Sequence, residues 1–213
     1  MLNPNNDDQQ YTGSLLEVLE YLALAIVQAG AFICESPGLT FKGYLEMYKT
    51  NQARLLLEYS GQKVDSYKWT VYTTWQISFQ KLEQQSSIAA QLFMICAFWH
   101  HKSIPKALFQ NAVIGAGDYR VLPLGWDEAV KVVDAFCEAD GSWNDLRFQE
   151  AINKLNSFSL ITSYFEDQLS LHPLVQSWAQ YDCQQKSLRI NNLSGYMLGL
   201  AVRDKEGSNE YLI

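Results

Sequence analysis

Residues 158–173 read Phe-Ser-Leu-Ile-Thr-Ser-Tyr-Phe-Glu-Asp-Gln-Leu-Ser-Leu-His-Pro, and this stretch decides the fold class. Residues 158–165 are strand-like, 166–168 form a polar turn, and 169–171 alternate between apolar and polar, which predicts a β-hairpin. Because proline is favourable in the first turn of a helix, His172-Pro173 is expected to open a helix to about residue 184. Helices followed by a two-stranded wing are the order of a winged-helix domain.

The residues before this hairpin predict further helices of the same domain. Residues 88–99 are strongly apolar, and Pro105 suits the first turn of a helix to about residue 114. Glycines and prolines between 115 and 125 mark a long loop. Asp127 and Asn144 are suited to cap two more helices before the hairpin.

The sequence upstream of this domain predicts a separate bundle of amphipathic helices. Apolar residues recur there at the helical spacings of three and four, over 15–33, 40–49, 52–59 and 69–82. The expected segments are a disordered lead-in (1–14), a helical domain (15–84), a winged-helix domain (85–187) and the start of a linker or helical-repeat region (188–213). The predicted fold class is mainly α, a small helical bundle followed by a winged-helix domain with a short β-hairpin.

The composition is that of a globular chain with an acidic balance. The 213 residues carry 16 Lys and Arg against 23 Asp and Glu, a formal net charge of −7, and 48% of them are hydrophobic. Because phosphate binding needs a basic face, this balance argues against a nucleic-acid partner. The longest uncharged stretch, residues 21–34, is shorter than the roughly 20 apolar residues of a membrane span, so no membrane partner is expected.

The start of the chain and its cysteines predict a soluble cytoplasmic protein. Residues 1–8 are polar and acidic, whereas a signal peptide begins basic and then turns apolar. The four cysteines, Cys34, Cys96, Cys137 and Cys183, are spread evenly and form no CxxC pair. This spacing favours buried cysteines in a reducing compartment over a disulfide framework or a zinc site.

Motifs for catalysis are missing from the sequence. It contains no GxxxxGK(S/T) phosphate loop and no GxGxxG, GxSxG or HExxH, so we predict no catalytic residue, no metal ligand and no enzymatic activity. Gly115-Ala-Gly117 lacks a preceding strand and is interpreted as a plain loop. Cys96 and His100 could pair a thiol with a base, but no second pair of ligands follows, so we interpret them as a solvent-exposed helix end.

Two features next to the predicted hairpin indicate which ligands this domain could bind. His172 stands before a helix N-terminus, which attracts anions, so its imidazole could donate to a phosphate; the alternative is a half-buried, hydrogen-bonded histidine. The helix before the hairpin carries Asp145, Arg147, Glu150 and Lys154, whose charges cancel. A DNA-reading helix should add positive charge, so we expect this domain to pack against another protein domain.

Several segments, in the same order, resemble those of NB-ARC proteins, the signal-transducing STAND NTPases of the NLR type. Residues 21–33, YLALAIVQAGAFI, resemble the GLPL-type helix in the form LPLALxQAGAYI of fungal members. Residues 73–79, TTWQISF, look like the TTWxxSF segment, and residues 90–109 look like the start of the winged-helix domain. Residues 169–179, LSLHPLVQSWA, resemble the fungal form of the MHD segment, HPLVxxWA.

The resemblance implies a role in cytoplasmic signal transduction and innate immunity. In this family a helical and a winged-helix domain close over ADP or ATP held by a separate P-loop domain, and the MHD histidine contacts the ADP phosphate. Carried over by position, the nucleotide-binding residues are Leu22, Ala23, Leu24 and His172, with Ala23 where the motif usually has proline. ADP or ATP is then expected only when the chain is joined to a P-loop domain. The implied partners are that domain or the full-length receptor, and a helical-repeat sensor.

Three functions follow from these observations. The first is the lid portion of an NB-ARC-type signalling NTPase, which contributes to ADP binding and conformational switching with a P-loop domain absent from this sequence. The second is a winged-helix DNA-binding regulator, which the acidic balance opposes. The third is a structural protein-interaction module without nucleotide contact.

Overall fold

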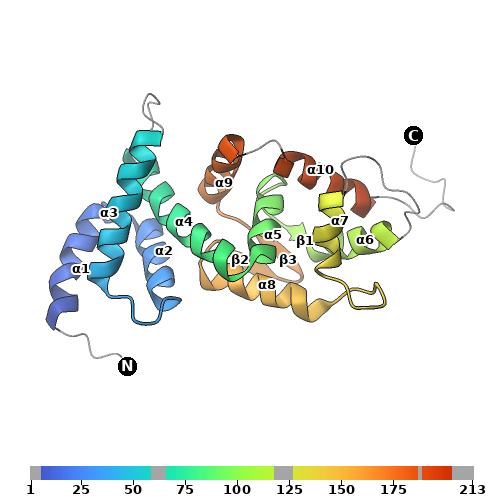
Figure 1. The fold of residues 1–213 in the computed structure, drawn as a ribbon, viewed down its shortest axis with the longest axis horizontal. Coiled ribbons are helices and arrows are strands. Elements are labelled where there is room, and N and C mark those ends of the chain that lie inside the picture. Colours follow the sequence, from blue (N-terminus) through green and yellow to red (C-terminus); the bar gives the residue numbers. More distant parts are fainter. Residues whose placement is uncertain (1–5, 59–65, 118–126, 187–188, 203–213) are drawn as a thin grey trace. The chain divides into compact units, whose positions relative to one another are not determined.

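The computed structural model describes residues 6–58, 66–117, 127–186 and 189–202 (Figure 1). Within these ranges the chain is mainly helical, with ten helices and one small three-stranded sheet, which confirms the predicted mainly α fold class. The chain divides into two compact units, Met1–Ser87 with Lys154–Leu160, and Ile88–Asn153 with Ile161–Ile213. Among the described helices, none has the length and apolarity to cross a membrane.

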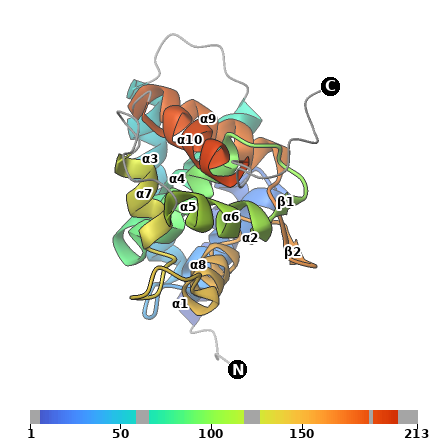
Figure 2. The same cartoon turned by 90° about the vertical axis from the view of Figure 1, so that its right-hand side faces the viewer.

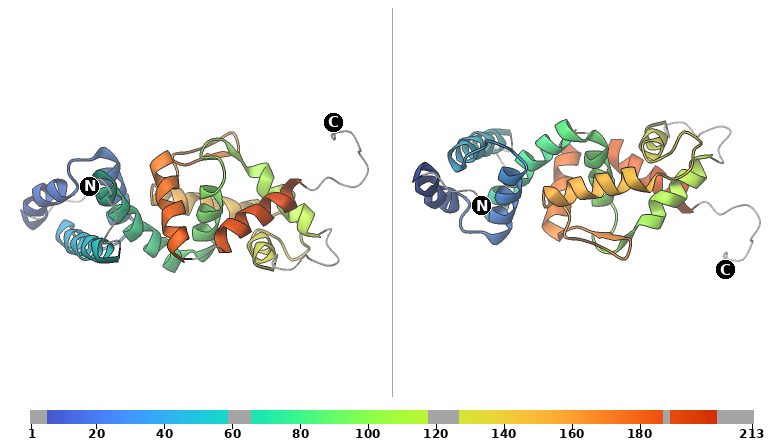
Figure 3. Two further views of the ribbon diagram at one scale, coloured as in Figure 1. Left: turned by 90° about the horizontal axis from the view of Figure 1, so that it is seen from above. Right: turned by 90° about the horizontal axis from the view of Figure 1, so that it is seen from below.

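The first unit is a bundle of helices, α1 (Asn6–Val18), α2 (Ala23–Cys34), α3 (Phe41–Glu58) and α4 (Ser66–Gln85). Helix α3 packs against α1 and α4, and α2 packs against α4; Figure 3 shows α1 beside α3 in both views. Large buried side chains fill the core, including Leu19, Phe32, Tyr44, Tyr48, Trp75 and Phe79. Phe158 belongs to this unit as well, and its ring centroid lies 6.4 Å from that of Phe32.

The helix predicted over 15–33 is interrupted at Glu20 and Tyr21, which have positive φ angles of 53° and 54°. The N–H of Tyr21 donates to the carbonyl of Leu16, and the N–H of Glu20 donates to Glu17. These paired bonds are those of a Schellman helix end, which normally places glycine at the left-handed position. The prediction of one continuous helix is therefore wrong.

Helix α1 also begins earlier than expected, at Asn6. The prediction of a disordered lead-in is therefore wrong over 6–14, while residues 1–5 lie outside the described residues. The early turns are held by packing on α3, where Lys42 Nζ lies 5.6 Å from the ring centroid of Tyr11. A polar segment can join a helix when a neighbouring helix supports it.

The two helices predicted within 40–59 are one continuous helix, α3. The polar side chains at the expected break bond back to the preceding turn: Thr50 Oγ1 donates to the Glu46 carbonyl, and Asn51 Nδ2 donates to the Met47 carbonyl, each at 2.9 Å. Because these bonds satisfy the side chains within the helix, the polar pair does not end it.

The remaining elements are α5 (Ser87–Ala97), β1 (Ile104–Pro105), α6 (Lys106–Gly117), α7 (Asp127–Asp134), α8 (Asp145–Ser157), β2 (Ser163–Phe165), β3 (Gln168–Ser170), α9 (Pro173–Lys186) and α10 (Arg189–Val202). They belong to the second unit, apart from residue 87 of α5 and residues 154–157 of α8, which belong to the first. The predicted hairpin is confirmed, since β2 and β3 pair antiparallel with Phe165 opposite Gln168. Its predicted bounds are wrong, because β2 begins only at Ser163 and Gln168, expected in the turn, is the first residue of β3. Glu166 and Asp167 between them both have positive φ, 48° and 58°, as a type I′ turn requires.

A third strand joins this hairpin where the sequence predicted the start of a helix. Ile104 lies opposite Leu169, so β1 pairs with β3 and the sheet order is β1-β3-β2. Pro105 has no N–H to donate, and it therefore suits an edge strand. Helix α6 begins directly afterwards, at Lys106.

Helix α6 continues through Gly115 and Gly117, so the interpretation of these residues as a plain loop is wrong; residues 118–126 lie outside the described residues. Helix α10 packs against α6 and α7, as Figures 2 and 3 show. A Cβ placed on Gly115 would lie 2.3 Å from the carbonyl oxygen of Leu200. Gly115 is therefore the point at which the two helix backbones approach closely.

Candidate functional sites

The motif-bearing residues of the first unit lie at the start of α2. Leu22 is the N-cap residue, with an extended backbone (φ −75°, ψ 117°) and no side-chain cap hydrogen bond. Ala23 is exposed, and Leu22 and Leu24 are half-buried. The first N–H groups of a helix lack intrahelical partners. The start of α2 therefore offers backbone hydrogen-bond donors next to the small, exposed side chain of Ala23.

The left-handed turn before α2 is tied to α4. Thr70 Oγ1 donates to Glu20 Oε1 at 2.8 Å, and the phenol of Tyr48 is hydrogen-bonded to Thr70 and Thr73. Burial raises the pKa of Tyr48 to about 12, against the smaller lowering effect of these bonds. Tyr48 therefore stays protonated at neutral pH, and the cluster holds the turn through neutral hydroxyl groups.

His172 is the N-cap residue of α9. Its Nδ1 accepts the backbone N–H of Leu174 at 3.2 Å, and its carbonyl accepts the N–H of Gln176 at 3.0 Å. The ring is half-buried. Since Nδ1 accepts a hydrogen bond, the neutral imidazole carries its proton on Nε2, which remains a donor.

The three histidines of the chain gather near the ends of α5 and β3. The ring centroids of His100 and His101 lie 4.7 Å apart, and the N–H of Leu171 donates to the carbonyl of His101 at 2.8 Å. Desolvation, followed by the charges of His100, Lys102 and His172, lowers the pKa of His101. This lowered pKa favours the neutral form of the His101 imidazole. Over the described residues, no group of three or more His, Cys, Asp or Glu is arranged to hold a metal.

Cys96 and His100 do not form a thiol–base pair. Cys96 is fully buried, and burial raises the pKa of its thiol, while His100 is exposed and its Nδ1 accepts the N–H of Lys102. The interpretation of this segment as an exposed helix end is confirmed for His100. The expectation that the cysteines are buried is correct for Cys96 but wrong for Cys34, which is exposed at the end of α2. Cys183 lies outside the residues whose side chains are described.

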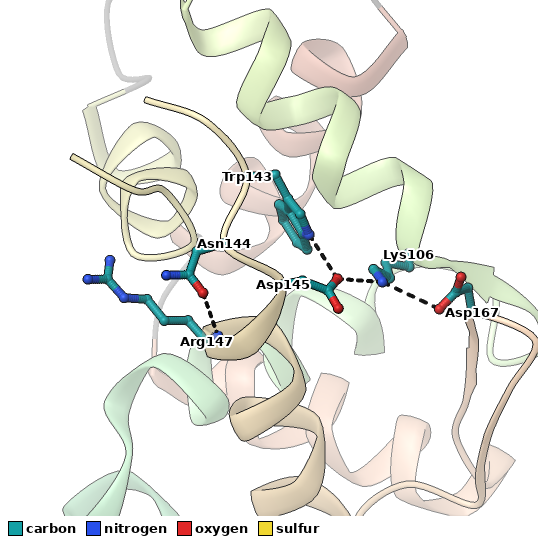
Figure 4. A network of polar contacts seen from close by, with 6 residues as sticks. All are labelled: Lys106, Trp143, Asn144, Asp145, Arg147 and Asp167. Carbon is teal, nitrogen blue, oxygen red and sulfur yellow. Dashed lines mark hydrogen bonds and ion pairs between the residues drawn. The ribbon is translucent and has the colours of Figure 1, made fainter. Parts of the chain in front are cut away.

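A polar network fixes the tip of the hairpin to the start of α8 (Figure 4). Lys106 Nζ lies 2.5 Å from Asp145 Oδ1 and 3.5 Å from Asp167 Oδ1. The indole N–H of Trp143 donates to Asp145 at 3.0 Å. The hydrogen bonds from Lys106 and Trp143 lower the pKa of Asp145, so the carboxylate is ionised at neutral pH.

The predicted cap of α8 is confirmed, because Asn144 Oδ1 accepts the N–H of Arg147 at 2.9 Å (Figure 4). Arg147 Nη1 donates to the carbonyl of Cys137 at 2.6 Å, and Lys154 pairs with Glu35 at 2.9 Å. The cations of α8 are thus engaged with protein groups.

A cleft of about 520 Å³ opens in the first unit beside the end of α2. It is lined by Phe32, Ser36, Pro37, Gly38, Leu39, Met47, Asn51, Ile77, Gln80, Lys81 and Gln84. No local sequence pattern predicts this cleft, because its walls come from three helices and the connection between α2 and α3. Lys81 gives no signal of its own, because Ser78, Gln84 and Gln85 are among the residues three and four positions away from it.

The four sequence-predicted site residues fall into two groups. Leu22, Ala23 and Leu24 are adjacent at the start of α2 in the first unit, and His172 belongs to the second unit. Comparisons with known proteins found no matching family model, no matching curated protein and no matching solved structure. The described residues define a mainly helical protein of two units with a small antiparallel sheet.

Proposed function

We propose that the chain is the lid portion of an NB-ARC-type signalling NTPase, a helical domain followed by a winged-helix domain that works with a preceding P-loop domain. The observation that carries the proposal is His172. It follows the hairpin, caps α9 through Nδ1 and keeps Nε2 as a donor. An imidazole N–H at a helix N-terminus suits a phosphate oxygen.

The order of elements supports the winged-helix part of this proposal. Helix α8, the hairpin β2–β3 and helix α9 follow one another, and β1 adds the third strand. Lys106 links the hairpin tip to α8 through Asp145 and Asp167. These contacts join the wing to α8 within the unit that carries His172.

The first unit supports the helical-domain part. Leu22, Ala23 and Leu24 stand at an uncapped helix start that follows a left-handed turn. The turn is held by Thr70 of α4, three residues before Thr73 of the segment that resembles TTWxxSF. The backbone donors of this start and the small side chain of Ala23 fit the close approach of a nucleotide ring.

ADP titration of the isolated chain by calorimetry tests whether it is incomplete. Without a phosphate loop the chain lacks the main source of phosphate affinity, so we expect no binding, or binding weaker than millimolar. Micromolar ADP binding by this chain alone would contradict the proposal that a P-loop domain is needed.

Two variants of His172 separate nucleotide contact from capping. Asparagine is a favourable N-cap residue, so His172→Asn retains a cap acceptor but lacks the imidazole Nε2 donor, whereas His172→Ala loses both. In the polypeptide that includes the P-loop domain, we expect both variants to release ADP faster and His172→Ala alone to be destabilised. If the chain is a structural module, His172→Asn will release ADP at the wild-type rate.

A DNA-binding regulator is the alternative function, because a hairpin that follows a helix is also the order of elements in DNA-binding winged-helix domains. Arg147 and Lys154 of α8 are engaged by Cys137 and Glu35, so we expect no shift of random duplex DNA in a gel at low salt. Non-specific binding is strongest at low salt, and a shift there would favour the DNA-binding function instead.

A further inference from the structure

The cleft beside the end of α2 has an apolar floor and a polar rim. Phe32 and Ile77 are buried, and Leu39 and Met47 are half-buried at its wall. Gln80 and Gln84 on α4 add amide groups to the lining. With a volume of about 520 Å³, the cleft falls in the range of about 300–1,000 Å³ typical of small-molecule sites.

Lys81 brings a positive charge to this lining. Its Nζ donates to Ser36 Oγ and lies 4.9 Å from the ring centroid of Phe32. Ser36 Oγ in turn donates to the Phe32 carbonyl at 2.6 Å. Within the described part of the chain, no carboxylate lies within 4.0 Å of Lys81 Nζ. Because an ammonium has three donors, further N–H groups are available to a ligand.

The charges around Lys81 leave a local positive excess. Glu35 is paired with Lys154 at 2.9 Å, so two lysines face one carboxylate in a chain whose formal net charge is −7. Desolvation is the largest cause that lowers the pKa of Lys81. A cation that is partly removed from water gains from a bound anion more than an exposed one does.

We propose that this cleft binds a small organic carboxylate with an apolar body, of the size of a medium-chain fatty acid. The carboxylate accepts hydrogen bonds from Lys81 Nζ, and the apolar body lies on Phe32, Met47 and Ile77. This site is separate from the residues assigned to nucleotide contact and does not depend on the proposed function.

Calorimetric titration of the full chain with octanoate tests the proposal. Lys81→Gln should weaken octanoate binding by about tenfold or more, the effect of losing about 1.4 kcal/mol of interaction with a charge-assisted donor. Lys42→Gln is the matched control, because Lys42 also lies over an aromatic ring, that of Tyr11, but does not line the cleft. We expect it to bind octanoate as the wild type does.

Two further measurements test the proposal even if Lys81→Gln does not fold. Octanol has the same chain without the charge, so it should bind wild-type protein several-fold more weakly than octanoate. Glu35→Gln removes a neighbouring negative charge, so it should strengthen octanoate binding. Undetectable octanoate binding at millimolar concentration, equal binding of octanol, or equal weakening by Lys42→Gln would each overturn the proposal.

Discussion

The close approach of α10 to α6 makes Gly115→Ala the sharpest test of the fold. In an open helix position, replacing glycine by alanine stabilises a protein by about 1 kcal/mol. At Gly115 the added Cβ would lie 2.3 Å from the Leu200 oxygen, so one backbone must move to reach an acceptable contact of 3.0 Å or more. Overpacking of this kind costs about 1–3 kcal/mol.

The matched control is Gly195→Ala in α10, because none of the described residues comes within 4 Å of a Cβ at that position. The propensity gain is common to both variants, so Gly115→Ala should be less stable than Gly195→Ala by about 1–3 kcal/mol. For a chain of this size each kcal/mol corresponds to about 2–4 °C in Tm, which thermal unfolding followed by circular dichroism resolves. Equal stabilisation by the two substitutions would refute the α6–α10 packing.

Three other predictions follow from single contacts. Asn144→Ala removes the cap of α8 and should cost about 1 kcal/mol in urea unfolding; an unchanged midpoint would contradict the capping role. Lys106→Gln removes the partner that lowers the pKa of Asp145. A carboxyl group whose pKa is lowered by folding stabilises the protein at pH values above its unfolded-state pKa, about 3.9 for aspartate, and this stabilisation is lost as the pH falls through the folded-state pKa. The free energies of unfolding of wild type and variant should therefore differ at pH 7 and converge in acid. A thiol reagent should label the exposed Cys34 in the native chain and the buried Cys96 only after unfolding; equal labelling would contradict their assigned burial.

Local patterns in the sequence were sufficient for several elements. The polar residues 166–168 between strand-like runs predicted the hairpin, and Asn144 predicted the start of α8 through its cap. Pro173 predicted the start of α9. These signals act within a few residues of the chain, which is why they can be recognised without the rest of the fold.

The sequence-based predictions were wrong at positions whose conformation depends on tertiary contacts. Glutamate and tyrosine take left-handed conformations at Glu20 and Tyr21, where the usual signal would be glycine, and Thr70 holds that turn from α4. Gly115 was interpreted as part of a loop, but it lies inside α6, where the backbone of α10 approaches it closely. The pairing of Ile104 with Leu169 joins residues far apart in the chain.

The candidate sites, like the fold, were predictable from the sequence only where a local pattern marks them. His172 was identified from its motif and its place before a helix, and its role as the cap of α9 depends on ring orientation, which the sequence does not specify. Lys81 was missed because Ser36, which accepts its hydrogen bond, is distant in sequence. Clefts formed by several helices follow from packing rather than from any local pattern.

The central claim is that these two units serve a P-loop domain, and sequencing the full-length transcript that encodes the chain tests it most directly. We expect an in-frame GxxxxGK(S/T) phosphate loop upstream of residue 1, after a strand and before a helix. An in-frame stop codon upstream, with no such motif between it and residue 1, would contradict the proposed function.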